Sequence, residues 1–259
     1  MGQKKLIKFA AIKEYNNVLE FPQDMQGKWA AFFDALKKEK SSNTPLTLEL
    51  ACGRGEYAVG LGRMFPEQHF IGIDLKGNRI WKGASIANKD GLKNVAFVRS
   101  QIELTSNYFA KDEVDEIWIT FPDPQLRWSK AKKRLTHPKF LRLYQQFLKN
   151  DGIIHLKTDS PLLYNFTLKM IEMYGLHLIY KTDHLYTEQN IDPRCLIKTY
   201  YEGLDIAQSS KIHYIQFNID KDLPLELDAV LKEAIKDIPM DAGELIRMEA
   251  ETARAKKED

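Results

Sequence analysis

Between residues 46 and 174 the sequence alternates short apolar runs with longer amphipathic runs, and this alternation limits the fold more than any other feature. The apolar runs have the length of buried strands, and the runs between them have the spacing of helices that pack one face on a core. Predicted strands cover 46–50, 69–74, 94–100, 116–121 and 152–158, and predicted helices cover about 56–65, 78–88, 137–149 and 161–174. Strands joined by crossover helices form a parallel sheet. The sequence therefore predicts an α/β fold with a mostly parallel sheet.

The two ends of the chain depart from this rhythm. The start is polar, with helical spacing over 27–40, and predicts a partly helical extension. Two further strands are expected at 176–182 and 212–219, joined by a long polar loop without a helix, and they would close the sheet as an antiparallel pair. The expected parts are an N-terminal extension at 1–45, a central domain at 46–220 and a C-terminal helix with a charged tail at 221–259.

Composition excludes several classes of protein. The net charge is only +2, so any strongly basic segment is local. Two cysteines, Cys52 and Cys195, lie far apart and predict neither a zinc site nor a disulfide framework. No apolar run approaches the roughly 20 residues that span a bilayer. We therefore expect a cytoplasmic protein that binds no membrane and no metal.

A glycine-rich turn follows the first central strand. Gly53 and Gly55 would let the backbone approach a ligand closely and let the next helix begin tightly. Asp74 stands at the end of the second strand, 19 residues beyond Gly55, where its carboxylate can accept hydrogen bonds from both hydroxyls of a ribose. The pattern predicts a cofactor that contains a nucleoside, bound at the carboxyl ends of parallel strands.

Two kinds of cofactor fit this turn. Gly53, Gly55 and Ala58 match the fingerprint of dinucleotide-binding proteins, which favours an NAD-dependent oxidoreductase. Glu49, just before the turn, favours S-adenosylmethionine instead, because a carboxylate repels a pyrophosphate and attracts a sulfonium and an ammonium group. Glu49 also has a purely structural interpretation, as a carboxylate that caps the next turn, and Asp74 has one as the N-cap of the following helix.

The stretch "ITFPDPQLRWSKAKKRLTHPKF" places Asp123 between two prolines at the end of a strand. From Pro124 to Asn150 there are eight basic residues and no acidic one: Arg127, Lys130, Lys132, Lys133, Arg134, Lys139, Arg142 and Lys149. These features are compatible with an ordinary turn followed by a solvated helix face. They are equally compatible with a fixed carboxylate beside a surface that binds the phosphates of a nucleic acid.

Taken together, the motifs resemble those of the bacterial tRNA (guanine-N7-)-methyltransferases over residues 27–218. The matching segments are "LELACGRG", "FIGIDLKGNR", "ITFPDPQ", "KKRLTHPKFL", "IIHLKTDS" and "TYYE" at 199–202. The resemblance implies a class I, Rossmann-like methyltransferase fold. It implies methyl transfer from S-adenosylmethionine to N7 of guanine in the variable loop of tRNA, at position 46 in the family, with S-adenosylhomocysteine as product. It implies no obligatory protein partner, so we expect a monomer or a homodimer.

The patterns and the resemblance together assign roles to individual residues. Asp123 falls on the family's catalytic aspartate. The expected cofactor-binding residues are Glu49, Gly53, Gly55, Asp74, Gln101 and Asp123. The expected substrate-binding residues are Arg127, Asp159, Thr199 and Glu202, with Lys130, Lys132, Lys133 and Arg134 of the basic run.

This chain departs from the family pattern at four positions. Ala51 replaces the first glycine of the turn, and Gln101 stands where the family has an aspartate. Gln125 and Arg127 replace a tryptophan and a lysine after the Pro-Asp-Pro. A non-catalytic RNA-binding protein on a methyltransferase fold is therefore a further alternative, although retention of Glu49, Asp74 and Asp123 disfavours it.

Overall fold

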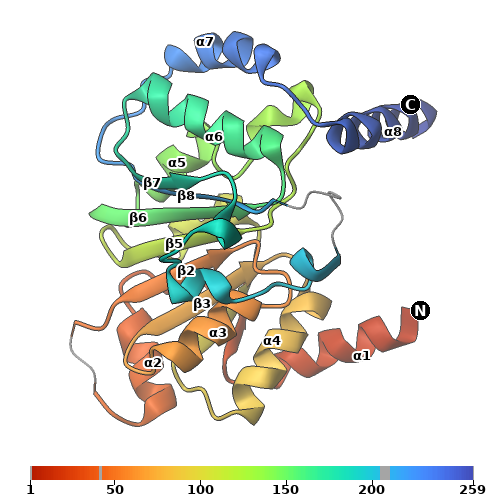
Figure 1. The fold of residues 1–259 in the computed structure, drawn as a ribbon. Helices are drawn as coiled ribbons and strands as arrows, with labels where there is room; N and C mark the ends of the chain where they lie inside the picture. The colour runs from red at the N-terminus through yellow and green to blue at the C-terminus, as the bar shows by residue number, and fades with distance from the viewer. Residues whose placement is uncertain (1, 41–42, 205–210, 259) are drawn as a thin grey trace.

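The computed structural model describes residues 2–40, 43–204 and 211–258, which form an eight-stranded sheet with helices on both faces (Figure 1). The strands are β1 (Val18–Glu20), β2 (Leu46–Leu50), β3 (His69–Asp74), β4 (Val95–Arg99), β5 (Val114–Thr120), β6 (Leu148–Thr158), β7 (Leu178–Thr182) and β8 (His213–Asn218). The helices are α1 (Gly2–Lys13), α2 (Trp29–Lys37), α3 (Glu56–Met64), α4 (Gly77–Lys89), α5 (Pro138–Tyr144), α6 (Pro161–Tyr174), α7 (Leu227–Ala234) and α8 (Ala242–Glu258).

The strands lie in the order β1-β4-β3-β2-β5-β6-β8-β7. Strands β1 to β6 pair in parallel, and β8 runs antiparallel to both β6 and β7. The predicted α/β class, the parallel sheet and the antiparallel C-terminal pair are therefore confirmed. Strands β2 and β3 and helix α6 begin and end at the predicted residues.

Side chains that alternate along the strands build two separate cores. Leu48 and Ile119 face a core that they share with α2, α5, α6 and α7. Phe97 and Trp118 face the opposite core, which α3 and α4 cover. Because both faces of the sheet are covered, the central strands are apolar on both sides, which explains their almost unbroken apolar runs.

Two elements differ from the prediction. The helix expected over 137–149 ends at Tyr144, because Leu148 already pairs with Val114 and begins β6. The N-terminal extension contributes β1, which was not predicted and which pairs with β4 through Val18 and Phe97. The extension therefore belongs to the same sheet as the central domain.

In its described residues, the long connection between β7 and β8 contains three single 3₁₀ turns, at Leu185–Thr187, Pro193–Leu196 and Glu202–Leu204, rather than no helix at all. Its Leu185 and Cys195 are buried against Trp118 and Tyr214, so the connection covers sheet surface as a helix would. We call residues 183–204 the covering loop.

The covering loop is held by charged groups as well as by packing. Arg194 donates to Glu116 of β5 at 2.6 Å, and the same carboxylate contacts His155 of β6 at 2.6 Å. Although burial alone raises the pKa of Glu116, the hydrogen bonds and charges of His155 and Arg194 hold it at about 2. His155 also stacks on Trp118, with ring centres 4.0 Å apart, which agrees with a structural role for this histidine.

None of the described helices combines the length and the apolar character that crossing a membrane requires.

Candidate active site

The carboxyl ends of β2, β3, β5 and β6 surround a cavity of about 480 Å³. The cavity is lined by Ala51, Cys52, Gly53, Glu56, Asp74, Lys76, Arg79, Thr120, Phe121, Pro122, Asp123, Pro124, Asp159, Thr199, Tyr201 and Arg247. Ligands of open parallel sheets bind at this edge, where neighbouring strands send their connections in opposite directions. The structure thus brings together the predicted glycine turn and three predicted aspartates, Asp74, Asp123 and Asp159.

The glycine turn has a left-handed backbone at three positions: Ala51, Gly53 and Gly55 have φ of 55°, 55° and 71°. Asp74 fixes this turn, since its Oδ2 accepts from the Gly53 N–H at 3.0 Å and its Oδ1 accepts from the Lys76 N–H at 2.7 Å. Each oxygen keeps a second lone pair for a ligand. Asp74 is buried, so the interpretation as a surface N-cap is wrong, and the N-cap position of α4 is Lys76.

Glu49 lies beneath the glycine turn and does not line the cavity. Its Oε2 accepts from the Ala58 N–H at 2.9 Å in the first turn of α3, as the capping interpretation expects. Burial raises the pKa of Glu49 to about 8, and the charge of Glu56 adds to this effect. The carboxyl is therefore largely protonated at neutral pH, and a cation bound nearby would favour its ionised form.

Asp123 stands on a loop with a constrained backbone. Phe121 and Gln125, at the two ends of Phe-Pro-Asp-Pro-Gln, have φ of 46° and 50°, a region that side chains with a Cβ seldom occupy. The Asp123 Oδ1 accepts from the Gln125 N–H at 3.0 Å, and the side chain is exposed at the mouth of the cavity. One hydrogen bond from the backbone of its own loop thus orients the carboxylate.

Arg134 has a structural role that differs from the prediction. Its side chain is fully buried, and it donates to the carbonyl oxygens of Pro124 and Gln125, both at 3.1 Å. The guanidinium also lies 4.6 Å from the centre of the Phe166 ring. A buried arginine cannot reach a phosphate in this conformation, so the predicted contact between Arg134 and the substrate is wrong, and the residue instead supports the loop that carries Asp123.

Six of the seven remaining basic residues of the run divide into two groups. Arg142, Lys149 and Lys139 pair with carboxylates of the same chain: Asp228, Asp115 and Glu103. Lys130, Lys132 and Lys133 lie in the 3₁₀ helix Trp128–Lys133, which buries Ala131 and leaves Lys132 and Lys133 exposed. Among the described residues these three lysines form no ion pair. They are the part of the run that is available to a polyanion.

Thr199 and Glu202 cap each other reciprocally. The Thr199 Oγ1 accepts from the Glu202 N–H at 3.1 Å, and the Glu202 Oε2 accepts from the Thr199 N–H at 3.4 Å. Thr199 lines the cavity, whereas Glu202 turns inward to Lys157 at 3.1 Å. Of this Thr-x-x-Glu motif, only the threonine therefore faces a ligand in the cavity.

Lys157 is a residue that sequence reasoning missed. It lies in "KTD" at the end of β6, its side chain is fully buried, and it donates to the carbonyl oxygens of Cys195 at 2.8 Å and Ile197 at 3.2 Å. With Glu202 it ties the covering loop to the sheet. The sequence analysis singled out Asp159 of this motif, and nothing in the sequence showed that the lysine points inward.

Aromatic residues of the covering loop lie against the glycine turn. The guanidinium of Arg54 is 3.4 Å from the centre of the Tyr200 ring, and that of Arg79 is 5.3 Å from the Tyr201 ring. Tyr201 also lines the cavity beside Gly53. These contacts close one side of the cavity, and none of them was predicted.

Three other predicted residues lie away from the cavity lining. Gln101 is exposed at the end of β4, before the 3₁₀ helix Ile102–Asn107. Gly55 precedes α3, and a Cβ there would meet the Phe97 ring at 2.3 Å, so this glycine allows close packing of helix on sheet. Arg127 lies next to Glu251 of α8, at 4.0 Å.

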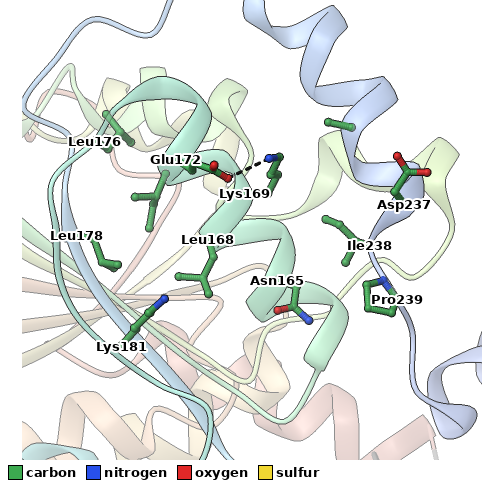
Figure 2. A pocket seen from close by; sticks show the side chains of 12 residues that line it. Asn165, Leu168, Lys169, Glu172, Leu176, Leu178, Lys181, Asp237, Ile238 and Pro239 are labelled. Carbon is green, nitrogen blue, oxygen red and sulfur yellow. Dashed lines mark hydrogen bonds and ion pairs between the residues drawn. The ribbon is translucent and has the colours of Figure 1, made fainter.

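A larger cavity of about 850 Å³ lies elsewhere, between α6, β7 and the chain before α8 (Figure 2). Leucines and isoleucines line much of it, and its Lys169 and Glu172 pair with each other at 2.9 Å. It contains none of the predicted site residues. Within the described ranges, no cluster of three or more histidine, cysteine or acidic side chains could hold a metal ion.

Comparison with known proteins gives first the class and then the family. The structure is similar to the crystal structure of the 16S rRNA methyltransferase KamB, with a TM-score of 0.52 and 14% identity over 74% of this chain and 94% of that chain. The fold is therefore that of a class I S-adenosylmethionine-dependent methyltransferase. A family model described as "Putative methyltransferase" matches residues 43–213.

Curated relatives define the family more closely. The tRNA (guanine-N(7)-)-methyltransferase of Bacteroides thetaiotaomicron is 44% identical over 249 residues, which cover 93% of each chain. The protein of that name from Porphyromonas gingivalis is 47% identical over 196 residues, covering 75% of this chain and 77% of the relative. This chain belongs to the tRNA (guanine-N7-)-methyltransferase family. Membership decides against the oxidoreductase alternative.

The first prediction concerns Glu49. Its folded-state pKa of about 8 exceeds its ordinary value of 4.5, so its contribution to stability is fully present below pH 4.5 and is lost as pH rises towards 8. Glu49→Gln keeps the acceptor for Ala58 but removes the ionisation. Without ligands, the melting temperature of the variant should therefore fall less between these pH values than that of the unaltered protein. Glu67→Gln, at an exposed glutamate, is the control. An equal fall of the melting temperature with pH in the unaltered protein and in Glu49→Gln would contradict the raised pKa.

The second prediction concerns Lys157. Lys157→Met keeps the aliphatic stem but leaves Glu202 buried without its cation, and breaking a buried pair costs about 3–5 kcal/mol. Denaturant unfolding should show a loss of this order in the free energy of unfolding. Lys198→Met, on the exposed side of the same loop, should change it by less than about 0.5 kcal/mol. Equal small effects of the two substitutions would mean that Lys157 does not hold the loop.

Proposed function

We propose that this protein transfers a methyl group from S-adenosylmethionine to N7 of a guanine in the variable loop of tRNA, at position 46 in the family. One observation carries the proposal: Asp74 with its glycine turn and Asp123 on its constrained loop line the same cavity. Asp74 and the glycine turn suit an adenosine, and Asp123 suits a base that is held next to the methyl donor. The names of the relatives supply the identity of that base and of its RNA.

The residues around the turn fit S-adenosylmethionine. Asp74 has both oxygens anchored and still has lone pairs for the two ribose hydroxyls, and Gly53 keeps the turn free of side chain beside it. Glu49 and Glu56 supply carboxylates near the turn, which a sulfonium and an ammonium would stabilise. When bound, S-adenosylmethionine supplies a methyl group on a positively charged sulfur. We assign Gln101 no direct contact in this conformation.

Asp123 would act on the guanine. N7 carries a lone pair and no proton, so no general base is needed there. As the methyl group moves to N7, positive charge appears on the purine, and a fixed carboxylate stabilises that charge more in the transition state than before it. Asp123 can also accept from N1–H and N2–H of guanine, which would align N7 with the methyl group. Asp159 and Thr199 line the same side and would hold the nucleotide.

The remaining assignments follow from this reaction. The central domain at 46–220 would bind both substrates, with the extension at 1–45 adding β1 and the segment at 221–259 adding α7 and α8. A protein that modifies tRNA is expected in the cytoplasm. We propose that it acts without an obligatory protein partner, as a monomer or a homodimer.

The test of the proposal is transfer of a labelled methyl group to unmodified tRNA, followed by identification of the modified nucleoside. We expect 7-methylguanosine, and we expect a tRNA whose position 46 is adenosine to remain unlabelled. A labelled methyl group at another position of the tRNA would show that the protein is a tRNA methyltransferase but that the assigned target is wrong. No transfer to any tRNA by folded protein would overturn the proposal itself.

The third prediction concerns Asp123. Asp123→Asn keeps the size and the hydrogen bond to Gln125 but removes the charge that stabilises the cationic purine. By comparison with other fixed electrostatic groups, kcat should fall by about 10²–10³, while calorimetry should find the affinity for S-adenosylmethionine nearly unchanged. Asp151→Asn, at an exposed aspartate in β6, should leave kcat as it is. If Asp123→Asn turns over nearly as fast as the unaltered protein, Asp123 has no catalytic role.

The fourth prediction concerns the unpaired lysines. Replacing Lys130, Lys132 and Lys133 with alanine should weaken tRNA binding without changing which base is methylated, because phosphate contacts carry no sequence information. If all three contact phosphates of duplex, the slope of log K against log salt should flatten by up to about 3, at roughly 0.9 per contact. Lys89, Lys93 and Lys111, which are exposed and form no ion pair among the described residues, provide a matched triple substitution as control. If the slope is unaltered when Lys130, Lys132 and Lys133 are replaced, these lysines are solvated surface residues that do not bind tRNA.

A further inference from the structure

Helix α8 is attached at the edge of the candidate site. Glu244, in its first turn, is fully buried and accepts hydrogen bonds from the Ser160 hydroxyl and from the Leu162 N–H at 3.1 Å. Ser160 is the N-cap of α6 and follows Asp159 directly. The first turn of α8 is thus fixed to the segment that carries a cavity-lining aspartate, rather than lying free as a tail.

One turn further along α8, Arg247 lines the same cavity as Asp123 and Asp159. Its Nε and Nη2 are buried and, among the described residues, have no hydrogen-bond partner. A guanidinium stays charged at any physiological pH and carries five N–H donors. Leaving buried donors unsatisfied costs about 1–3 kcal/mol, so a ligand that supplies oxygen acceptors at this position would be strongly favoured.

Helix α8 contacts the rest of the protein on both sides of Arg247. Glu244 anchors the helix before it, and Glu251, one turn after it, lies 4.0 Å from Arg127 beyond the Pro-Asp-Pro loop. Helix α8 therefore begins beside the end of β6 and contributes Arg247 to the cavity. Asp74 belongs to the end of β3, which is three places from β6 in the sheet order, so α8 meets the cavity at the end of the strand row opposite to the one assigned to the adenosine.

We propose that Arg247 binds a backbone phosphate of the target nucleotide and so admits RNA to a cavity that otherwise repels it. This inference rests on the proposed function. The cavity is lined by the carboxylates of Glu56, Asp74, Asp123 and Asp159, which suit a cationic methyl donor and oppose a phosphate. The planar fork of an arginine matches two oxygens of one phosphate. A guanine held by Asp123 and Asp159 brings its own phosphate to this side.

The two other cations that line the cavity are less suited to this role. Lys76 and Arg79 lie beside Asp74, at the start of α4, and Arg79 already lies over the Tyr201 ring. The carboxylate of the methionine part of S-adenosylmethionine is the one other anion that the proposed reaction brings into the cavity. It shares the chemistry of the phosphate, and the experiment below separates the two.

The test compares Arg247→Met, which keeps the stem that packs against the protein, with Arg247→Lys, which keeps the charge. For Arg247→Met we expect a KM for tRNA at least tenfold higher and a slope of log K against log salt that is flatter by about 0.7–0.9, the effect of one lost phosphate contact. Arg247→Lys should restore the slope. Arg254→Met, at an exposed arginine of the same helix, should raise the KM for tRNA less than threefold.

Several results would overturn the inference. Unchanged tRNA affinity and salt slope in Arg247→Met would make Arg247 a packing residue. Weaker binding of S-adenosylmethionine in the absence of tRNA would assign the arginine to the carboxylate of the methyl donor. Thermal melting and calorimetry accompany each variant, and Arg247→Gln, which removes the charge but keeps a polar side chain, takes the place of Arg247→Met in the salt titration if Arg247→Met does not fold. The proposed function fails separately, if the unaltered protein does not methylate tRNA.

Discussion

The site depends on one constraint of chain topology, namely that β2 and β5 are neighbours in the sheet while their connections leave in opposite directions. From β2 the chain passes through α3 to β3, and from β5 it passes through α5 to β6 on the other side. The helices that follow cover opposite faces, since α3 packs in one core and α5 in the other. Nothing then fills the space above the ends of these two strands, and a crevice is left where ligands bind.

The same edge holds backbone that departs from favoured geometry. Ala51 after β2 and Phe121 after β5 both have positive φ without being glycines. Such conformations cost of order 1–3 kcal/mol each and persist where surrounding contacts determine them. Here Asp74 holds the turn after β2, and buried Arg134 holds the loop after β5 through two carbonyl oxygens. The Ala51 that departs from the family's glycine thus occupies a position that still demands a glycine-like backbone.

Sequence reasoning succeeded where a local pattern fixed the outcome. The apolar runs of β2 and β3 gave their bounds, and the turn between them placed Asp74 at the cavity. Prediction from the sequence failed where a contact between distant segments determined the structure. β1 exists because it pairs with β4, and Arg134 could not be separated from its basic neighbours, because burial depends on the loop folded above it. Lys157 was missed for the same reason, because its partners lie on the covering loop, distant in sequence. Arg247 was missed because no local pattern places a residue of the C-terminal helix at the cavity.

Charge is distributed by depth around the site. The charged groups in and beneath the cavity are mainly carboxylates, and burial raises the pKa of the deepest of them, Glu49. The cations free to meet phosphates stand outside, on the 3₁₀ helix that follows Asp123. The carboxylates of the cavity thus attract the cationic methyl donor, and the lysines at its rim attract the polyanionic RNA. Arg247 stands on the boundary between these two regions, which is where a nucleotide must cross from one to the other.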